Sequence, residues 1–261
     1  MENSLNNRQI LKTLGLASLL LVCGLGIVRL QQPKLQVLRG SNLDKRDYER
    51  EINKEDIKVN LLKNLPAFGF DNLFADWGML QFIQYYGDEE ARKQTGYHLS
   101  PDYLEVIVNN DPRFVMAYMI ISPASSINAG RADRTISLMN RGLKSLTPDI
   151  EKAYYVWLYK GVDELLFLGD IPEAKRSYSM AGDWANRAGN EFISSMAQGT
   201  VQFLSTKPDS RRAQVGAWFM VYINVPDKET KALAKRNIER LGGKMIFYDN
   251  GRIQAIPPKN D

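Results

Sequence analysis

The sequence predicts an all-α domain of helical hairpins behind one N-terminal transmembrane helix, with a small β-hairpin at the C-terminal end. Three observations lead to this fold class. Residues 10–30 form one apolar run, helix signals recur through residues 64–241, and an Asn-Gly pair lies between two apolar stretches near the end. We therefore expect a membrane anchor at 1–30, a charged linker at 31–63, the helical domain at 64–241, and a hairpin with tail at 242–261.

The apolar run is the first predicted element. It has no charge between Lys12 and Arg29, which gives roughly 24 Å of helix against a bilayer core of about 30 Å. The two flanking cations can extend to the headgroups. A cleaved signal peptide and a lipid anchor on Cys23 are alternatives. We expect an uncleaved single-pass anchor that inserts residues 10–30 in the bilayer, because no A-x-A cleavage site follows.

Charges around this run predict the orientation. Arg8 and Lys12 precede it, whereas Arg29, Lys34 and Arg39 follow it closely. Because Lys and Arg favour the cytoplasmic side, we expect the domain behind the anchor to be cytoplasmic. The only cysteine lies within the run, so the domain gives no sign of an oxidising compartment.

Composition argues against several function classes. The net charge is only +4, and no Lys/Arg block with interleaved aromatics is present, so we expect no nucleic-acid partner. With one histidine and one cysteine, the chain indicates no His/Cys metal site and no cofactor. A Ser/His/Asp relay has only His98 available, and no nucleophile elbow accompanies it. We therefore predict that the protein is not an enzyme.

The linker and the helices follow in order. The mixed-charge stretch DKRDYEREINKEDIK predicts a solvated linker that ends in a helix. Helix N-termini are expected at Asp71, Asp88, Ser100-Pro101, Asp111-Pro112, Thr147-Pro148 and Asp170, and helix ends at Gly87, Gly130, Gly169 and Gly189. Asp170 with Glu173 three residues later forms a capping box. These signals predict helices of 10–20 residues joined into hairpins.

The helical signals also repeat. Gly130, Gly169 and Pro208 are spaced by 39 residues, as are Thr135, Ala174 and Ala213. Such a period is typical of stacked helical hairpins, in which each unit buries its apolar face against the next. We expect three second helices at this spacing.

One repeat carries a family resemblance. In the segment from Leu168 to Ala181, the residues Gly169, Ala174, Tyr178 and Ala181 fall on the glycine, alanine, aromatic and alanine positions of the tetratricopeptide repeat. The resemblance covers about residues 101–225, with a period longer than the usual 34. It implies a TPR-like array with a concave groove lined by the first helix of each hairpin. A membrane anchor followed by such an array also resembles the thylakoid assembly factors of cyanobacteria and plastids.

The last element is the β-hairpin. Asn250-Gly251 is a preferred two-residue type I′ loop, and it predicts that Tyr248 faces Ile253 and Ile246 faces Ala255. An isolated hairpin is unstable in water, so it either caps the last helix or presents an edge to a partner.

Two candidate binding surfaces follow from these elements. A polar stripe on the helix 149–168 and two glutamines on the next first helix would line the groove: Tyr155, Tyr159, Asp163, Gln198 and Gln202. The aromatic-rich segment after the linker contains a possible anchor patch for a partner or a membrane surface, or else core residues: Phe70, Phe74 and Trp77.

The functional expectation is a membrane-tethered, non-enzymatic scaffold for membrane-protein clients. The resemblance implies an assembly factor for a photosynthetic membrane complex. Tethering raises the effective concentration toward other membrane proteins, so a modest groove affinity suffices. The alternatives are a permanent accessory subunit of a membrane complex and a membrane-bound hydrolase centred on His98.

Overall fold

The computed structural model describes residues 15, 18, 20–29, 44–206, 210–226 and 228–259. These fall into two compact units, one up to Tyr48 and one from Glu49 onward. In the first unit residues 20–29 are helical and exposed. Residues 10–14, 16, 17, 19 and 30 of the predicted anchor lie outside the described part. No helix within the described part has both the length and the apolarity to cross a bilayer.

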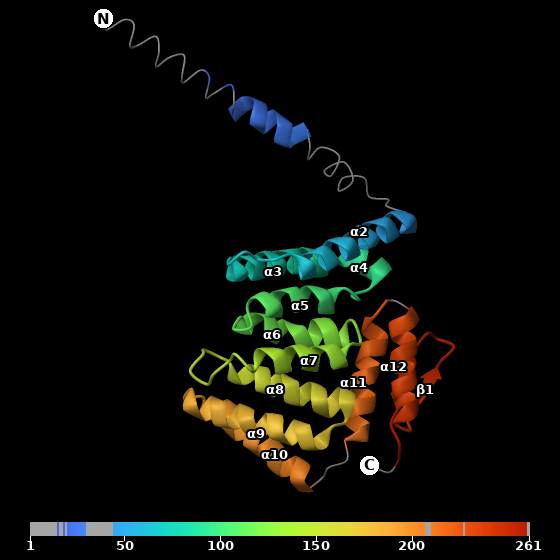
Figure 1. Cartoon of the computed structure of the whole chain (residues 1–261). Helices are drawn as coiled ribbons and strands as arrows, with labels where there is room; N and C mark the ends of the chain where they lie inside the picture. Colours follow the sequence, from blue (N-terminus) through green and yellow to red (C-terminus); the bar gives the residue numbers. More distant parts are fainter. Residues whose placement is uncertain are drawn as a thin grey trace, which may run out of the picture. The chain divides into compact units, whose positions relative to one another are not determined.

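The described chain is mostly helical, with one small antiparallel sheet near its C-terminal end (Figure 1). This confirms the predicted helical class and the C-terminal hairpin. The α-helices are α2 Lys45–Asn64, α3 Asp71–Gly87, α4 Glu89–Thr95, α5 Ser100–Asn110, α6 Val115–Ile121, α7 Ala132–Gly142, α8 Tyr154–Asp163, α9 Ile171–Arg187, α10 Glu191–Thr206, α11 Arg211–Asn224 and α12 Lys228–Arg240. Two π-helical segments, η1 Ser122–Ile127 and η2 Glu164–Leu168, continue α6 and α8, and the strands are β1 Lys244–Phe247 and β2 Ile253–Ile256.

Local capping explains several helix boundaries. The Asp88 and Asp170 carboxylates accept hydrogen bonds from the backbone N–H of Ala91 and Glu173, each at 3.1 Å, as the capping patterns predict. Gly169 ends η2 with φ +68°, a left-handed conformation that a residue without Cβ adopts at little cost.

Other predicted boundaries are wrong. α5 begins at Ser100 itself, with Leu99 at the N-cap position and no side-chain cap. The Asp111-Pro112 and Thr147-Pro148 pairs open turns, and the next helices start only at Val115 and Tyr154. In the first turn, the Asp111 carboxylate accepts from the Arg113 N–H at 2.9 Å. An Asx turn competes with a helix N-cap for the same residue types, which explains the error.

The predicted linker ends in a helix, α2, as expected, but this helix is not a solvated segment. Residues 31–43 of the linker lie outside the described part. From residue 49 onward the predicted linker belongs to the helical unit, because α2 buries Ile52, Val59 and Leu62 in the main core. Lys63 forms ion pairs with Asp102 at 2.8 Å and Glu105 at 3.0 Å on α5. The apolar residues are sparse among the charges of this helix, so composition alone favours a solvated segment.

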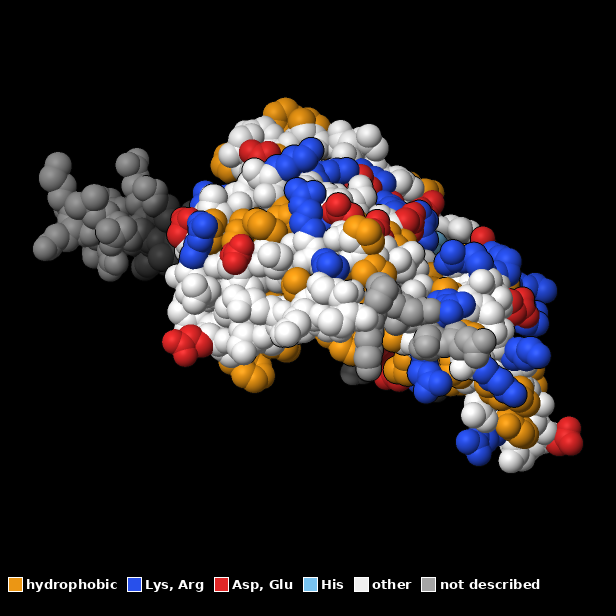
Figure 2. All heavy atoms as spheres, turned by 90° about the horizontal axis from the view of Figure 1, so that it is seen from below, with side chains coloured by type: hydrophobic (Ala, Val, Ile, Leu, Met, Phe, Trp, Pro, Cys, Tyr) orange, Lys and Arg blue, Asp and Glu red, His pale blue; other side chains and the backbone are white. Residues whose placement is uncertain are grey.

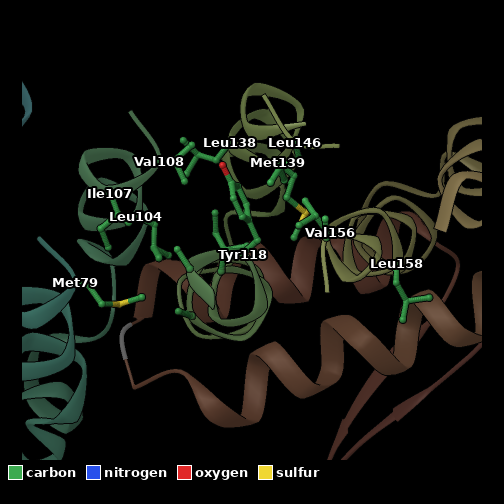
Figure 3. Packing of buried hydrophobic residues seen from close by; sticks show 14 of the residues in the cluster. Met79, Leu104, Ile107, Val108, Tyr118, Leu138, Met139, Leu146, Val156 and Leu158 are labelled. Carbon is green, nitrogen blue, oxygen red and sulfur yellow. The ribbon is translucent and has the colours of Figure 1, made fainter. Parts of the chain in front are cut away.

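The helices from α3 to α10 lie one above another in layers (Figure 1). α3 packs on α5, α8 on α9, and α9 on α10. Small residues permit close approach: a Cβ on Gly78 would lie 3.3 Å from Ile107, and one on Gly161 would lie 3.1 Å from Tyr178. Figure 3 shows Tyr118 of α6 between side chains of α5 and α7, including Leu104, Ile107, Leu138 and Met139. Burial of these side chains holds the layers together.

α11 and α12 interrupt the predicted repeat. They form an antiparallel pair that runs across the ends of the layered helices rather than adding the next layer (Figure 1). α11 packs on η1 and η2, and the Trp218 ring meets Phe167 edge-on at 5.5 Å. The period of 39 therefore does not continue into α11. Pro208, the third residue of the predicted series, lies outside the described part. The apolar side of α11 packs against η1 and η2, which are distant from it in sequence.

The hairpin exists as predicted, but its register is shifted by one residue. Ile246 pairs with Gln254, and Phe247 pairs with Ile253. The Gly251 N–H donates to Tyr248 O, and Gly251 has φ +79°, whereas Asn250 is not among the residues with positive φ. The connection is therefore a three-residue loop with a left-handed glycine, and a type I′ turn, which needs two positive φ angles, is excluded. β1 packs on α12 and β2 on α11, so the hairpin is supported by the last two helices.

The closest helix packing gives a testable prediction. Gly142 at the end of α7 faces the Tyr118 hydroxyl, with which an added Cβ would overlap. We expect Gly142→Ala to lower the free energy of unfolding by about 1–3 kcal/mol through overpacking. Urea denaturation followed by circular dichroism measures this change.

The matched control is Gly199→Ala in α10, where no other residue lies within 4 Å of the new Cβ. That substitution should raise the free energy of unfolding by about 0.5–1 kcal/mol. Equal effects at the two glycines would contradict the packing.

Candidate functional site

The turn between α2 and α3 has an unusual backbone. Pro66 follows α2 by two residues and prevents its continuation. Phe68 and Gly69 then both have positive φ, +51° and +86°. The left-handed region costs a bulky residue about 1–2 kcal/mol, and such strain is concentrated at binding sites. The Phe68 side chain is 83% exposed, so packing does not offset this cost.

Beyond this turn, one side of α3 is apolar and exposed. Leu73, Trp77 and Leu80 are spaced by four and three residues and share one helix face. They are 66%, 43% and 58% exposed, and Phe70 before the helix is 68% exposed. We call these four residues the α3 apolar face. Contiguous apolar surface of this kind is typical of protein or membrane interaction sites.

The face contains a shallow hollow. It measures about 360 Å³, is almost free of polar surface, and is lined by Phe70, Leu73, Phe74 and Trp77. The rings of Phe74 and Trp77 meet edge-on at 6.0 Å. The structure thus brings together all three residues of the predicted anchor patch and adds Leu73, which the sequence analysis missed. Leu73 follows Phe70 by three residues and precedes Trp77 by four, and this helical spacing could have identified it as a member of the patch.

The opposite side of α3 is buried against the rest of the helical unit. Met79, Phe82 and Tyr85 are buried in the core. The Tyr85 hydroxyl accepts from the Leu99 N–H at 3.2 Å, and the Arg92 guanidinium lies 3.9 Å above its ring. Burial raises the pKa of Tyr85 to about 12, so the phenol stays neutral at physiological pH. The exposed face of α3 is therefore presented on a fixed helix.

The predicted groove residues do not gather in one place. Tyr155 and Tyr159 are half-buried on α8, where their rings stack at 6.1 Å. Gln198 and Gln202 are exposed on α10. α9 packs against both α8 and α10 and separates these two pairs by one helical layer.

Asp163 corrects the predicted polar stripe. Its side chain is fully buried, and it accepts hydrogen bonds from Ser122 at 2.9 Å and Ser126 at 2.8 Å. The wide turn of η1 places both serines on the same side, facing the end of α8. Burial raises the pKa of Asp163 to about 7, although the two hydroxyl groups lower it. This residue cannot contact a docked segment.

A second set of buried polar side chains joins α8 and η2 to α9. Lys160 forms an ion pair with Glu164 at the start of η2, and Ser177 of α9 donates to Glu164 at 2.6 Å and accepts from Lys160 at 3.0 Å. All three side chains are buried. Because a buried pair needs such additional partners, this triad holds α8 and α9 in one register. This triad was not predicted from the sequence, although Lys160 and Glu164 have the i, i+4 spacing of a helical ion pair.

His98 lies exposed in the turn between α4 and α5. It lines a polar cavity together with residues of α12 and of the connection into α7. Within the described part, no group of three or more His, Cys, Asp or Glu side chains is placed to hold a metal ion.

The chain was compared with family models, with curated proteins and with solved structures, and none of them matches it.

The buried Asp163 gives a pH prediction. Its pKa is about 7 in the folded protein and 3.8 in the unfolded chain, so the folded state binds the proton more tightly. The stabilisation is fully present below pH 3.8 and is lost as the pH rises through 7. The difference between the two pKa values is worth about 4 kcal/mol. Asp163→Asn should therefore gain stability relative to the wild type as the pH rises from 5 to 8.

Urea denaturation at several pH values measures this relative gain. Asp76→Asn on the exposed side of α3 is the control, and its pH profile should follow that of the wild type. A constant difference between Asp163→Asn and the wild type over this range would show that Asp163 titrates normally.

Proposed function

We propose that this chain is a membrane-tethered, non-enzymatic scaffold that holds membrane-protein clients during assembly of a membrane complex. In this proposal its helical hairpins are a divergent TPR-like array, and its tether is the apolar run at residues 10–30. The α3 apolar face is the main observation in its favour. It replaces the groove around Tyr155 as the client-binding surface.

The length of the chain supports this arrangement. Between Leu30 and Lys45 it can span at most about 50 Å. A tether ending at Leu30 would therefore hold the start of α2 within that distance of the lipid surface. Confinement of this kind raises the effective concentration toward membrane-bound partners.

The chemistry of the face indicates the kind of client. Large exposed aromatic and aliphatic side chains at helical spacing fit the apolar side of a partner helix. The hollow between Phe70 and Trp77 accepts a side chain of that helix. A hydrophobic segment of an unassembled membrane protein has the matching surface.

The tether has its own test. The full chain should remain in the pellet when membranes from expressing cells are washed with alkaline carbonate, and deletion of residues 1–30 should release it. N-terminal sequencing of the mature chain distinguishes an uncleaved anchor from a signal peptide. A mature chain that begins after Arg29 and is released by carbonate would contradict the proposal.

The client surface is tested by Leu73→Asp combined with Trp77→Asp in the full chain. Both side chains are exposed, so the fold should persist. Loss of such anchors typically costs about 2 kcal/mol or more. We expect crosslinks between the chain and membrane-protein clients in native membranes to fall at least tenfold, as quantified by mass spectrometry.

A matched control is Asn72→Asp combined with Gln94→Asp, which adds two charges at exposed polar positions. Its crosslinks should equal those of the wild type. Undiminished crosslinking in the Leu73/Trp77 variant would show that clients bind elsewhere. Tyr155→Ala with Tyr159→Ala then tests the original groove.

The extent of exposed apolar surface also favours a second candidate, a permanent accessory subunit, because obligate interfaces are the more hydrophobic ones. A permanent subunit would co-migrate with one complex in fixed stoichiometry on a native gel. A scaffold would be found in substoichiometric amounts with assembly intermediates.

A further inference from the structure

A polar cavity at the start of α12 is separate from the α3 apolar face. It measures about 600 Å³ and is built by three segments of the chain. The end of α4 and the turn after it contribute Thr95 and His98, and the connection into α7 contributes Ala129 and Arg131. α12 contributes the rest of the lining: Lys228, Glu229, Thr230, Leu233 and Arg236.

The walls of this cavity are fixed by backbone contacts. Gly130 has φ +65°, and a Cβ there would lie 2.8 Å from the Thr230 methyl group. The first turn of α12 therefore packs directly on this connection. The Arg131 N–H donates to Ser125 O at 2.8 Å, which ties the same connection to η1. The backbone segments that carry the lining residues are thus packed together before any ligand arrives.

The charge of the lining is predominantly positive. Lys228 and Arg236 are exposed and form no ion pair with any carboxylate that the structure describes. Glu229 is the one acidic residue among the described residues of the lining. Among the residues that the structure describes, the lining therefore carries an excess of positive charge.

Asp133 orients the Arg131 guanidinium but uses only part of its hydrogen-bond donors. Asp133 accepts from its Nε at 2.9 Å and from its Nη2 at 2.8 Å. A guanidinium group has five N–H donors, so three remain for a ligand. A planar fork held in this way suits the geometry of a phosphate or carboxylate group.

Positive charge on α12 around the cavity also favours an anionic ligand. Lys and Arg outnumber Asp and Glu on α12 by five to two. Figure 2, which views the molecule from below, shows many Lys and Arg side chains on the right-hand side, where Figure 1 places α11, α12 and the hairpin. Clustered positive charge raises the local concentration of anions around a site.

We propose that this cavity is a binding site for a phosphoryl group, with Lys228 and Arg236 as the principal ligands and Arg131 as the oriented fork. The phosphoryl group belongs either to an anionic lipid headgroup or to a soluble phosphate compound. This proposal is independent of the proposed scaffold function, because the cavity shares no residue with the α3 apolar face.

The single histidine of the chain provides a direct readout. His98 lines the cavity, so its imidazole resonances report on binding without further assignment. Inorganic pyrophosphate is titrated into the full chain in phosphatidylcholine nanodiscs at constant ionic strength. We expect a saturable shift of the His98 Cε1–H signal, with chloride alone giving none.

The variants decide whether the cavity is responsible. Lys228→Gln combined with Arg236→Gln should weaken the binding at least tenfold. Lys235→Gln combined with Arg240→Gln removes the same charge from exposed positions of the same helix outside the cavity, and binding should stay within twofold of the wild type. All four side chains are exposed, and circular dichroism verifies that both variants are folded.

A second arm identifies the source of the phosphoryl group. If the ligand is a headgroup, the His98 signal shifts when phosphatidylglycerol is added to the nanodiscs in the absence of pyrophosphate. If the ligand is soluble, only pyrophosphate shifts it. The absence of a shift in both arms, or equal weakening in the two variants, would overturn the proposal.

Discussion

Every layer of the helical unit is stabilised by burying one helix face against the next, and this constraint leaves the outer face of α3 exposed. The inner side of α3 packs on α5 through Met79 and Phe82. Its outer side carries Leu73, Trp77 and Leu80, which remain exposed. Their apolar character is not required for the fold, because solvated positions on a helix tolerate polar residues. The exposed apolar surface therefore supports the proposed interaction of this helix with a partner.

The interior of the layers is held by polar groups as well as by apolar ones. Asp163 bonds to two serines of η1, and Lys160 and Glu164 bond to Ser177 of α9. Buried polar groups are costly unless they are satisfied, so each of these bonds is possible in only one alignment of the helices. Both π-helical segments adjoin this region. η1 contributes Ser122 and Ser126, η2 contributes Glu164, and α11 packs on both segments.

The local features of this protein were predictable from its sequence. Helix caps at Asp88 and Asp170, the left-handed glycine at Gly169 and the C-terminal hairpin depend on residues within a few positions of one another. The aromatic cluster around Trp77 was also recognisable, because regular spacing places its members on one helix face. Where two local motifs compete for one residue type, as in the turn at Asp111, the prediction was wrong.

The sequence by itself determined the helix starts at Asp88 and Asp170, the helix ends at Gly87 and Gly169, and the hairpin that follows the helices, because contacts between near neighbours set these features. Only the tertiary structure decided that α11 crosses the layered helices, that Asp163 is buried, and that His98 shares a cavity with Arg236. These outcomes depend on contacts between residues far apart in the chain. Such contacts leave no regular spacing in the sequence, since any apolar helix face can pack on more than one partner.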